Sequence, residues 1–445
     1  MTIKIRRLIF YSLIAIFIVL AFIIIPYSNG WIFDFKTFTF AKLGGLYLET
    51  DPIDAQIVVD GLQMQIKPGF LKSGILIANL FPKTYHVSVT KQDYQSWSRD
   101  VVVKSSLVTQ IHPIVLLPEK LQMDVVAKNV KNIFLNSQDI AWQDTNNSLK
   151  VNGNNIRGGQ FVSWLGDNKF VLTIDKPTGN YFAVNVNDDT ALNINLILKN
   201  LKDQKSINDT SKINKIIPYS SDGNKIVLES GKYLYLLDFN KPSIDIIKNG
   251  AYDPLVAGNG KVFFSDSKNL YSYDLNLKSN SIIAQKGAIS AEISPNNQFL
   301  AFSAENKLFL FDQTESQIKL IELANDPAYF KFSPDSKKLA VVSKNSWWIN
   351  IYFIGDDSEL FGKKPMDLSS FEVGTLDTDL PISWYNNSSY MFLKYSNSLD
   401  LLEIDDKNPP ENIQLVKNGI NKYFYNQKDN LIYLLIDSTL YKAYQ

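Results

Sequence analysis

Carboxylates are the side chains of this 445-residue sequence best placed to do chemistry. The sequence contains no cysteine and two histidines, His86 and His112. Disulfides, cysteine-ligated zinc, iron–sulfur clusters and thiol nucleophiles are therefore excluded. We interpret both histidines as surface or strand-edge residues, and the chain beyond residue 112 cannot hold a histidine-based triad or metal centre. Acid–base or calcium chemistry by Asp and Glu is what remains.

The acidic residues occur in two patterns, and we interpret both as structural. Adjacent acidic residues suggest a carboxylate pair or calcium, but neighbours in a strand face opposite ways and loop carboxylates are usually solvated. These pairs are Asp188-Asp189, Asp356-Asp357 and Asp405-Asp406. Other aspartates recur at the ends of alternating runs, where a repeated role indicates turn capping: Asp238, Asp274, Asp312 and Asp405.

Sequence motifs of known catalytic or cofactor sites are missing. No P-loop, dinucleotide fingerprint, H-E-x-x-H, EF-hand or nucleophile-elbow motif occurs. The adjacent Trp347-Trp348 could stack on a sugar, but we expect it to pack in the core. The sequence therefore predicts no catalytic, cofactor-binding or metal-binding residue and identifies no binding residue. We expect a protein that is not an enzyme and uses no cofactor.

The elements that position these residues repeat about eight times after residue 130. Each copy has a polar turn, an alternating apolar run, and a second run such as Lys307–Asp312 that often ends in Asp. Alternation with β-branched and aromatic residues predicts strands, and a spacing of roughly 36 to 42 residues is typical of a four-stranded propeller blade. We predict an all-β protein with a β-propeller over 118–445, with eight blades favoured and seven as the alternative. Asn200–Lys212 and Gly355–Asp377 are expected to be loop insertions.

The two ends of this repeat region suggest how the ring closes. The final copy, Tyr423–Tyr444, supplies about three strands, and an unpaired edge invites aggregation. Gln122–Ala127 precedes the first copy and alternates weakly. We predict that it forms the outermost strand of the last blade.

One form of the repeat resembles a known family. The copies beginning Ser294-Pro295-Asn296 and Ser333-Pro334-Asp335 approach the pattern Ser-Pro-Asp-x-Lys-x-Leu-Ala. This pattern resembles the WD40-like blades of TolB-type propellers. The resemblance is specific only in these two copies, and it implies the propeller fold.

A second unit is expected between the N-terminus and the propeller. Residues 44–117 contain short alternating strands separated by turns, which predicts a small antiparallel β-sandwich. The unit resembles a PEGA domain, whose pattern has a Pro-Glu-Gly-Ala tetrad followed by a strand that ends in Asp-Gly. Pro52 and Ala55 match the ends of the tetrad, and Asp60-Gly61 matches the Asp-Gly. Further matches are Leu80, Pro82, Tyr85, Val87 and Tyr94, while Ile53, Asp54, Lys83 and Asp93 depart from the pattern at turns. The resemblance implies an adhesive or structural domain of a microbial cell surface.

The N-terminus predicts a membrane anchor. Lys4, Arg6 and Arg7 precede the apolar run Leu8–Ile25, which reaches ~27 Å as a helix against a hydrocarbon thickness of ~30 Å. Basic residues on the short side indicate that this end is cytoplasmic. We expect a cytoplasmic stub and transmembrane helix over 1–28 and an aromatic interfacial stretch or connector over 29–43. A signal peptide cleaved near Ser28-Asn29-Gly30 is the alternative.

These features predict a single-pass protein of the cytoplasmic membrane whose bulk lies outside the cytoplasm. Lys+Arg and Asp+Glu both number 45, so no net field favours nucleic acid. We expect a binding or scaffold protein of the cell envelope that contacts the bilayer through residues 8–25 and an envelope protein or polysaccharide through the propeller. The alternative is a glycan hydrolase or lyase, which would require convergent Asp or Glu with raised pKa in the central funnel. A sensor that signals through a partner is a third possibility.

Overall fold

The computed structural model describes residues 3–34, 38–64, 74–136, 139–157, 159–166, 169–219, 222–314, 320–344, 347–358, 360–405 and 412–444. The chain divides into two compact units. Unit 1 comprises 1–120 and 357–363, and unit 2 comprises 121–356 and 364–445. The polar turns of the first two repeat copies are expected at Asn136-Ser137-Gln138 and Gly166-Asp167-Asn168. Ser137, Gln138, Asp167 and Asn168 lie outside the described residues, as does Asp406 of the third acidic pair.

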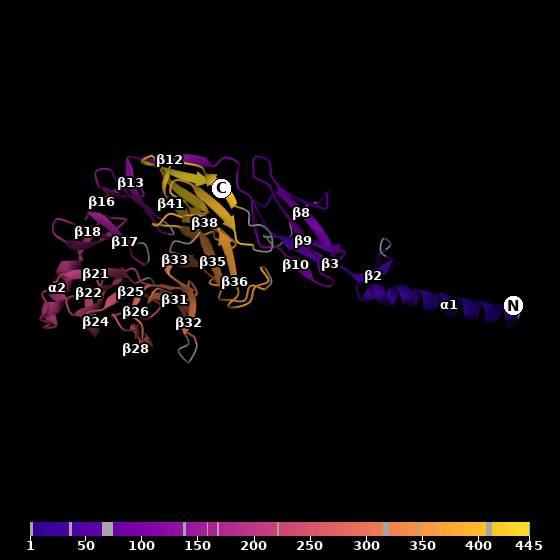
Figure 1. Cartoon of the computed structure of the whole chain (residues 1–445), viewed down its shortest axis with the longest axis horizontal. Helices are drawn as coiled ribbons and strands as arrows, with labels where there is room; N and C mark the ends of the chain where they lie inside the picture. Colours follow the sequence, from indigo (N-terminus) through magenta and orange to yellow (C-terminus); the bar gives the residue numbers. More distant parts are fainter. Residues whose placement is uncertain are drawn as a thin grey trace. The chain divides into compact units, whose positions relative to one another are not determined.

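Unit 1 begins with helix α1 (Ile3–Ser28), drawn in indigo in Figure 1. Within Ile5–Ser28, an 18-residue window has a mean hydropathy of 3.2 and no buried part, so the length and composition of the helix suit a membrane span, although a signal sequence would share both properties. The helix is longer than the predicted 8–25. Pro26 lies inside the helix, in its last turn, where a proline disturbs little helix beyond it. Gly30, with a left-handed φ of 78°, follows the helix end.

A hairpin follows the helix. Strands β1 (Trp31–Asp34) and β2 (Thr39–Lys42) are antiparallel, with Phe33 opposite Phe40. Part of the predicted connector 29–43 is therefore regular structure.

The rest of unit 1 is a small β domain. Its strands are β3 (Gly44–Leu48), β4 (Thr50–Asp51), β5 (Gln56–Val59), β6 (Leu62–Gln63), β7 (Ile75–Leu80), β8 (Thr84–Thr90), β9 (Trp97–Val102), β10 (Val108–Gln110) and β11 (Ile114–Val115). They pair in the orders β10-β3-β7, β6-β5-β8-β9 and β11-β4.

The alternating residues of this domain form its core. The alternation over residues 44–117 also predicts which side chains face inward, and these are buried in one apolar cluster: Leu46, Leu48, Ile57, Val59, Tyr85, Val87 and Val89, with Leu80 partly buried against them. The expectation of a purely antiparallel domain is wrong, because β10 runs parallel to β3 and β11 parallel to β4. Parallel neighbours need a long crossover, and the chain between β3 and β10 supplies it by forming the four-stranded sheet.

Unit 2 consists of eight four-stranded antiparallel sheets in its described residues. The first four are β13 (Val130–Leu135), β14 (Ile140–Asp144), β15 (Leu149–Val151), β16 (Asn154–Ile156); β17 (Gln160–Trp164), β18 (Phe170–Asp175), β19 (Asn180–Asn185), β20 (Ala191–Asn193); β21 (Ile213–Pro218), β22 (Lys225–Ser230), β23 (Tyr233–Asp238), β24 (Ser243–Asn249); and β25 (Asp253–Gly258), β26 (Lys261–Ser265), β27 (Leu270–Asp274), β28 (Ser279–Ala284).

The other four sheets repeat the same order. They are β29 (Ala288–Ile293), β30 (Phe299–Ala304), β31 (Lys307–Asp312), β32 (Leu320–Asn325); β33 (Pro327–Phe332), β34 (Lys338–Ser343), β35 (Trp348–Phe353), β36 (Leu368–Glu372); β37 (Ile382–Trp384), β38 (Tyr390–Lys394), β39 (Leu399–Glu403), β40 (Asn412–Val416); and β41 (Ile420–Asn426), β42 (Leu431–Ile436), β43 (Thr439–Tyr444) with β12 (Gln122–Lys128).

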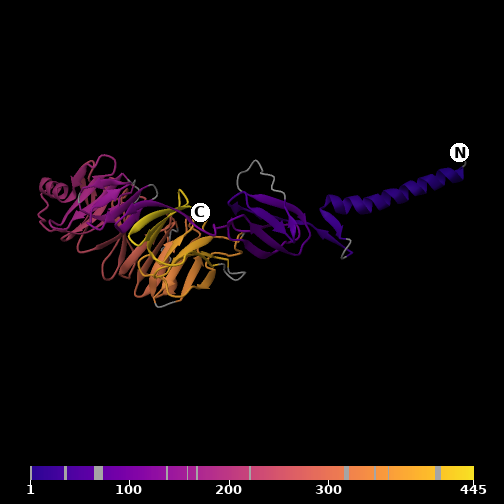
Figure 2. The same cartoon turned by 90° about the horizontal axis from the view of Figure 1, so that it is seen from above.

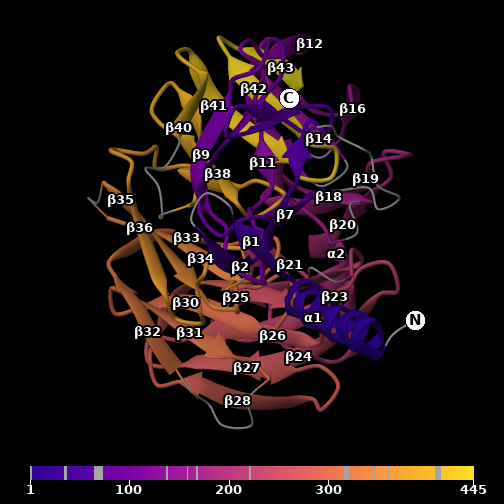
Figure 3. The same cartoon turned by 90° about the vertical axis from the view of Figure 1, so that its right-hand side faces the viewer.

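The first strand of each sheet forms the inner edge of a ring. Successive first strands contact one another from β17 through β21, β25, β29 and β33 to β37, and β41 contacts β13. Figure 3 shows the sheets following one another around a centre, from magenta through orange to yellow. This arrangement is consistent with a β-propeller.

The predicted closing strand is confirmed. Strand β12 pairs antiparallel with β43, with Gln122 opposite Tyr444 and Val125 opposite Tyr441. The violet strand therefore lies beside the yellow C-terminal strands (Figure 2). The first and last segments of the unit share one sheet, so β43 is not an edge strand.

In the Ser-Pro copies, the residues of the pattern form the turn between the first two strands of a sheet. The Ser333 hydroxyl donates to Asp335 (2.5 Å) and accepts from the Lys338 backbone N–H (2.9 Å). Asp335 also accepts from the buried Lys338 ammonium (2.8 Å). The neighbouring turns are joined, because Ser336 accepts from the Asn296 N–H (3.0 Å). These side chains replace the hydrogen bonds that the turn backbone cannot make to a strand.

Two predicted insertions are only partly loops. The first overlaps helix α2 (Ile194–Gln204), whose Ile194, Leu198 and Leu201 pack onto the sheets of β17–β20 and β21–β24. The prediction of a polar loop is wrong where the helix continues into it, because these three apolar residues recur at helical spacing across its start. In the second stretch, Leu368–Glu372 is strand β36, the fourth strand of its sheet.

Candidate functional site at the inner edge of the ring

In the part of the chain that the structure describes, three ion pairs of charged side chains line the inner edge. Each pair joins the first strands, or the residues just before them, of two neighbouring sheets. The pairs are Lys215–Asp253 (2.5 Å), Glu292–Lys331 (2.6 Å) and Asp379–Lys422 (2.8 Å). They lie at three alternate junctions of the ring: between β21 and β25, between β29 and β33, and between β41 and the segment before β37.

A β-bulge aims several of these side chains. The first strand of seven sheets is irregular near its start, for example between Ile213 and Lys215 and between Ile420 and Lys422. A bulge inserts one residue and re-aims those that follow. Lys215 and Lys422 both come directly after the extra residue. The bulge therefore gives both lysines the same place in their strands.

The pair Glu292–Lys331 is the least hydrated of the three. The Glu292 side chain is 21 % exposed and that of Lys331 is 48 % exposed. Burial raises the pKa of Glu292, although Lys331 opposes this. Burial lowers the pKa of Lys331, but attraction to Glu292 and to Tyr329 outweighs it and the pKa is raised. The lysine therefore stays protonated while the carboxyl group holds its proton more tightly than usual.

Aromatic side chains continue these links into the next sheets. The Trp384 indole N–H donates to the Lys331 carbonyl (2.9 Å), and the buried Tyr423 hydroxyl donates to Ser383 (3.0 Å). Burial also raises the pKa of Tyr423 and of Tyr329. Strands β33, β37 and β41 are thus joined by polar contacts along the inner edge.

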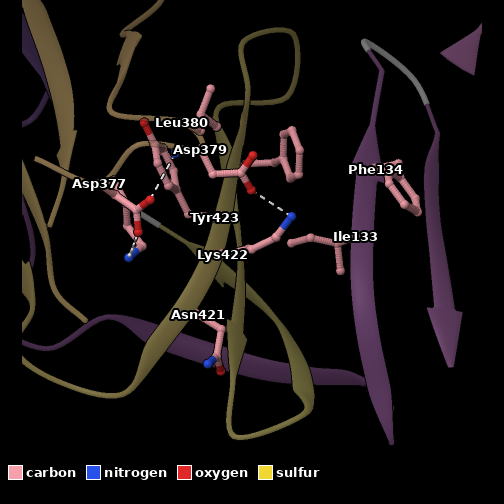
Figure 4. A pocket seen from close by; sticks show the side chains of 10 residues that line it. Ile133, Phe134, Asp377, Asp379, Leu380, Asn421, Lys422 and Tyr423 are labelled. Atoms are coloured by element: carbon pink, nitrogen blue, oxygen red, sulfur yellow. Dashed lines mark hydrogen bonds and ion pairs between the residues drawn. The ribbon is translucent and has the colours of Figure 1, made fainter. Parts of the chain in front are cut away.

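A cavity of about 240 Å³ lies where the ring closes, between β41 and β13 (Figure 4). Figure 4 shows the ammonium of Lys422, from β41, pointing toward Asp379. The lining is mixed apolar and polar: Ile133, Phe134, Asp377, Asp379, Leu380, Lys394, Asn421, Lys422, Tyr423 and Phe424. An apolar pocket with a few converging polar groups suits a small ligand or a single side chain of a larger one.

The charges of this cavity differ in exposure. Lys394 is 3 % exposed, and its ammonium donates to Asp377 (3.2 Å) and to the carbonyls of Ser396 (2.9 Å) and Tyr395. Burial opposes ionisation of Asp377, but the Asp379 N–H and Lys394 lower its pKa. Asp379, in contrast, is largely exposed. Lys394 and Asp377 therefore form a fixed floor, whereas Asp379 and Lys422 can meet a ligand.

An aromatic wall adjoins the cavity. Phe134 stacks on Phe161 of the next sheet, with ring centroids 4.0 Å apart, and Phe161 meets Trp164 edge-on. The Trp164 indole N–H and the Ser163 hydroxyl are buried and have no hydrogen-bond partner among the described residues. Buried polar atoms of this kind normally find a partner. This wall therefore contains two unsatisfied polar atoms among the described residues of the inner edge.

The interpretation of the acidic residues as structural holds in part. Asp238, Asp274 and Asp312 each accept backbone N–H groups of the following turn, as predicted. The described residues contain no group of three or more His, Cys, Asp or Glu placed to bind a metal. The prediction that Asp357 is a solvated loop residue is wrong, because this residue is buried. It lies in the 357–363 segment that belongs to unit 1.

Two other predictions are wrong. His112 is 3 % exposed and stacks on Phe361, with centroids 5.5 Å apart, so it is not a surface residue. His86 is exposed and pairs with Asp100 (2.8 Å), as expected of a strand-surface residue. Trp347 and Trp348 are 62 % and 45 % exposed instead of packed in the core. Trp348 is the first residue of β35 and Trp347 precedes it, so both lie at the end of the strand, outside its buried part.

The inner-edge pairs do not follow from the sequence pattern. Their partners lie 38 to 43 residues apart, as with Lys215 and Asp253 or Lys422 and Asp379. Local periodicity identifies strands but does not say which sheets are neighbours. The repeat length is the signal that could find them: a lysine and an acid about one repeat apart, both near the start of a first strand.

Comparison with known proteins adds little. No protein-family model matches this sequence, and no curated protein matches it. Among solved structures, that of Kluyveromyces lactis Hsv2p is similar with a TM-score of 0.40 and 11 % identity, over 72 % of this chain and 98 % of that chain. Because both values are low, the fold assignment rests on the strand pairing of this chain.

Proposed function

We propose that this protein is a membrane-anchored, extracytoplasmic binding scaffold of the cell envelope. In this proposal α1 is an uncleaved anchor, unit 1 is a PEGA-like spacer, and unit 2 is an eight-bladed propeller. The cavity at the closing junction contacts an envelope protein or polysaccharide. The protein does not act as an enzyme.

The inner-edge ion pairs are the observation that carries this proposal. Catalytic carboxylates need freedom to exchange protons with a substrate. Glu292, Asp253 and Asp379 are instead each held by a lysine of a neighbouring sheet. Paired charges join sheets and present a neutral polar surface, which suits recognition.

The PEGA-like assignment draws support from the turn geometry. Asp60 and Gly61 both adopt left-handed φ, 49° and 81°, as a two-residue hairpin of the expected Asp-Gly type requires. Asp60 accepts from Lys83 (2.5 Å) and from the His86 N–H (2.9 Å). Lys83 replaces a family glycine, and here it ties two turns together.

A glycan hydrolase remains the second candidate because Glu292 has the raised pKa that a general acid needs. That mechanism also requires a second carboxylate across the glycosidic bond. Release of reducing ends from envelope polysaccharide by the wild type, and its loss in Glu292→Gln, would favour the hydrolase and contradict the scaffold.

Topology can be tested sharply because the chain has no cysteine. We would place single cysteines at Leu277, which is exposed in unit 2, and at Ile3, which is exposed at the start of α1. A membrane-impermeant maleimide should label Leu277→Cys in intact spheroplasts and Ile3→Cys only after lysis. The reverse pattern, or loss of residue 3 from the mature protein, would overturn the anchor.

Binding is tested with a photo-crosslinking amino acid at Asn421 in the cavity and, as a matched control, at Leu277. We expect a discrete envelope adduct at position 421 that disappears when Asp379→Asn and Lys422→Gln are combined. Identical adducts at both positions would contradict a specific site.

A further inference from the structure

The hairpin that follows α1 has one aromatic face. Trp31, Phe33, Phe40 and Lys42 share this face, because Trp31 lies opposite Lys42 and Phe33 opposite Phe40. Phe33 meets Phe40 edge-on at 5.1 Å, and the Lys42 ammonium lies 5.4 Å from the Trp31 ring centroid. Phe38 adds a further ring at 6.2 Å from Phe33.

The exposure of these aromatic rings to water is energetically unfavourable. Phe38 is 77 % exposed and Phe40 53 % exposed. Phe38 also has a left-handed φ of 55°, a conformation that bulky residues rarely adopt. A two-stranded hairpin alone is marginally stable in water. A surface that covers the aromatic face would explain both its composition and its shape.

The chain places that surface within reach. Helix α1 has 26 residues and spans ~39 Å, which exceeds a ~30 Å hydrocarbon core and ends among the headgroups. Asn29 and Gly30 alone separate the helix from β1, so Trp31 lies within ~11 Å of Ser28. Tyr27 is exposed in the last helical turn. Trp, Tyr and Lys are the residues that membrane interfaces favour.

We propose that the β1–β2 hairpin docks its aromatic face into the outer headgroup region of the bilayer that α1 crosses. The occupant of this face is lipid: the rings enter the boundary between headgroups and acyl chains, and Lys42 turns toward phosphate. The hairpin then fixes the depth of the helix end. This inference rests on the proposed anchor and goes beyond it, since a bare anchor requires only α1.

The test uses the full-length chain in phosphatidylcholine liposomes with single cysteines carrying an environment-sensitive fluorophore. The positions are Phe38, Thr39, Ile14 in α1 and Leu62 as an exposed control in unit 1. Thr39→Cys leaves every aromatic residue in place, so it reports even if Phe38→Cys disturbs the hairpin. Quenchers are lipids spin-labelled near the headgroup, lipids spin-labelled deep in the chain, and aqueous iodide.

Thr39 lies on the opposite face of β2 from Phe40. We therefore expect the shallow lipid label to quench position 38 most and position 39 less, with iodide quenching at both weaker than at Leu62. Equal iodide access at 38, 39 and 62 would overturn the inference, as would shielding from both iodide and lipid, which would show protein packing. Ile14 separates the two proposals. If the deep label quenches Ile14 but the shallow label does not quench the hairpin positions, α1 is an anchor and the docking proposal is wrong. If quenching at Ile14 resembles that at Leu62, the anchor proposal itself is wrong.

Discussion

The core of unit 1 and the inner edge of unit 2 are built on different principles. The unit 1 cluster is apolar throughout, from Leu46 to Leu116, and each member is held by removal from water. The inner edge of unit 2 joins neighbouring sheets with ion pairs such as Glu292–Lys331, which stay partly hydrated. Apolar clusters such as Phe263 to Phe311 lie behind this edge, between the sheets. Stability and the exposed chemistry of unit 2 are therefore carried by different residues.

Opening the ring should have the largest effect on the stability of unit 2. Deleting residues 441–445 removes the part of β43 that pairs with Gln122, Met123, Asp124 and Val125. We expect loss of the cooperative unfolding transition of unit 2, measured by circular dichroism during denaturant titration in detergent. Deleting residues 1 and 2, at the other end of the chain, is the control. An unchanged midpoint after the C-terminal deletion would show that closure contributes nothing.

A core substitution in unit 1 should have the next largest effect. Leu48→Ala removes a fully buried side chain, which costs about 2–5 kcal/mol. Fluorescence of Trp97, which lies in the same cluster, should report an earlier transition for unit 1 while unit 2 unfolds as before. Leu76→Ala, at an exposed position in the same domain, should change little. Equal shifts in both units would mean that they unfold as one.

The Ser-Pro turn sharpens the comparison because it buries a charge in unit 2. Lys338→Ala leaves Asp335 without its ammonium partner, and we expect a loss of about 2 kcal/mol. Burial opposes ionisation of Asp335, but Lys338 lowers its pKa below 3.8. Its contribution is thus present above pH 3.8 and lost as pH falls through the lowered pKa. The wild type should approach Asp335→Asn in stability below that pH; a constant gap would contradict this.

The smallest effect is expected at the inner edge itself. Glu292→Gln should change stability by less than ~1 kcal/mol near neutral pH, because Lys331 is half exposed. The raised pKa of Glu292 means that the folded state binds its proton more tightly than the unfolded state does. The wild type should therefore lose stability relative to Glu292→Gln as pH rises from about 4.5 through the raised pKa. The opposite trend in a pH series of melts would contradict the pKa direction.

The sequence predicts the parts of this structure that depend on local pattern. Alternation locates strands such as Lys307–Asp312, and the need for a partner beside the last strand points to Gln122–Ala127. Features that depend on contacts between residues far apart in the sequence do not follow from the local pattern. His112 is buried because Phe361, far along the chain, stacks on it. The pairing of Glu292 with Lys331 depends on which sheets adjoin and on where bulges fall.

The closed ring is central to this account, because the candidate cavity lies between β41 of the last sheet and β13 of the first. The double variant Asp124→Cys with Lys442→Cys tests it directly, since these residues face each other across β12 and β43 and the chain has no other cysteine. We predict a disulfide on mild oxidation, seen as a mobility shift that reductant reverses, and a higher melting temperature for unit 2. The mispaired variant Asp124→Cys with Thr439→Cys should not cross-link. Failure of the matched pair to cross-link, or equal cross-linking of the mispaired one, would contradict the closed ring.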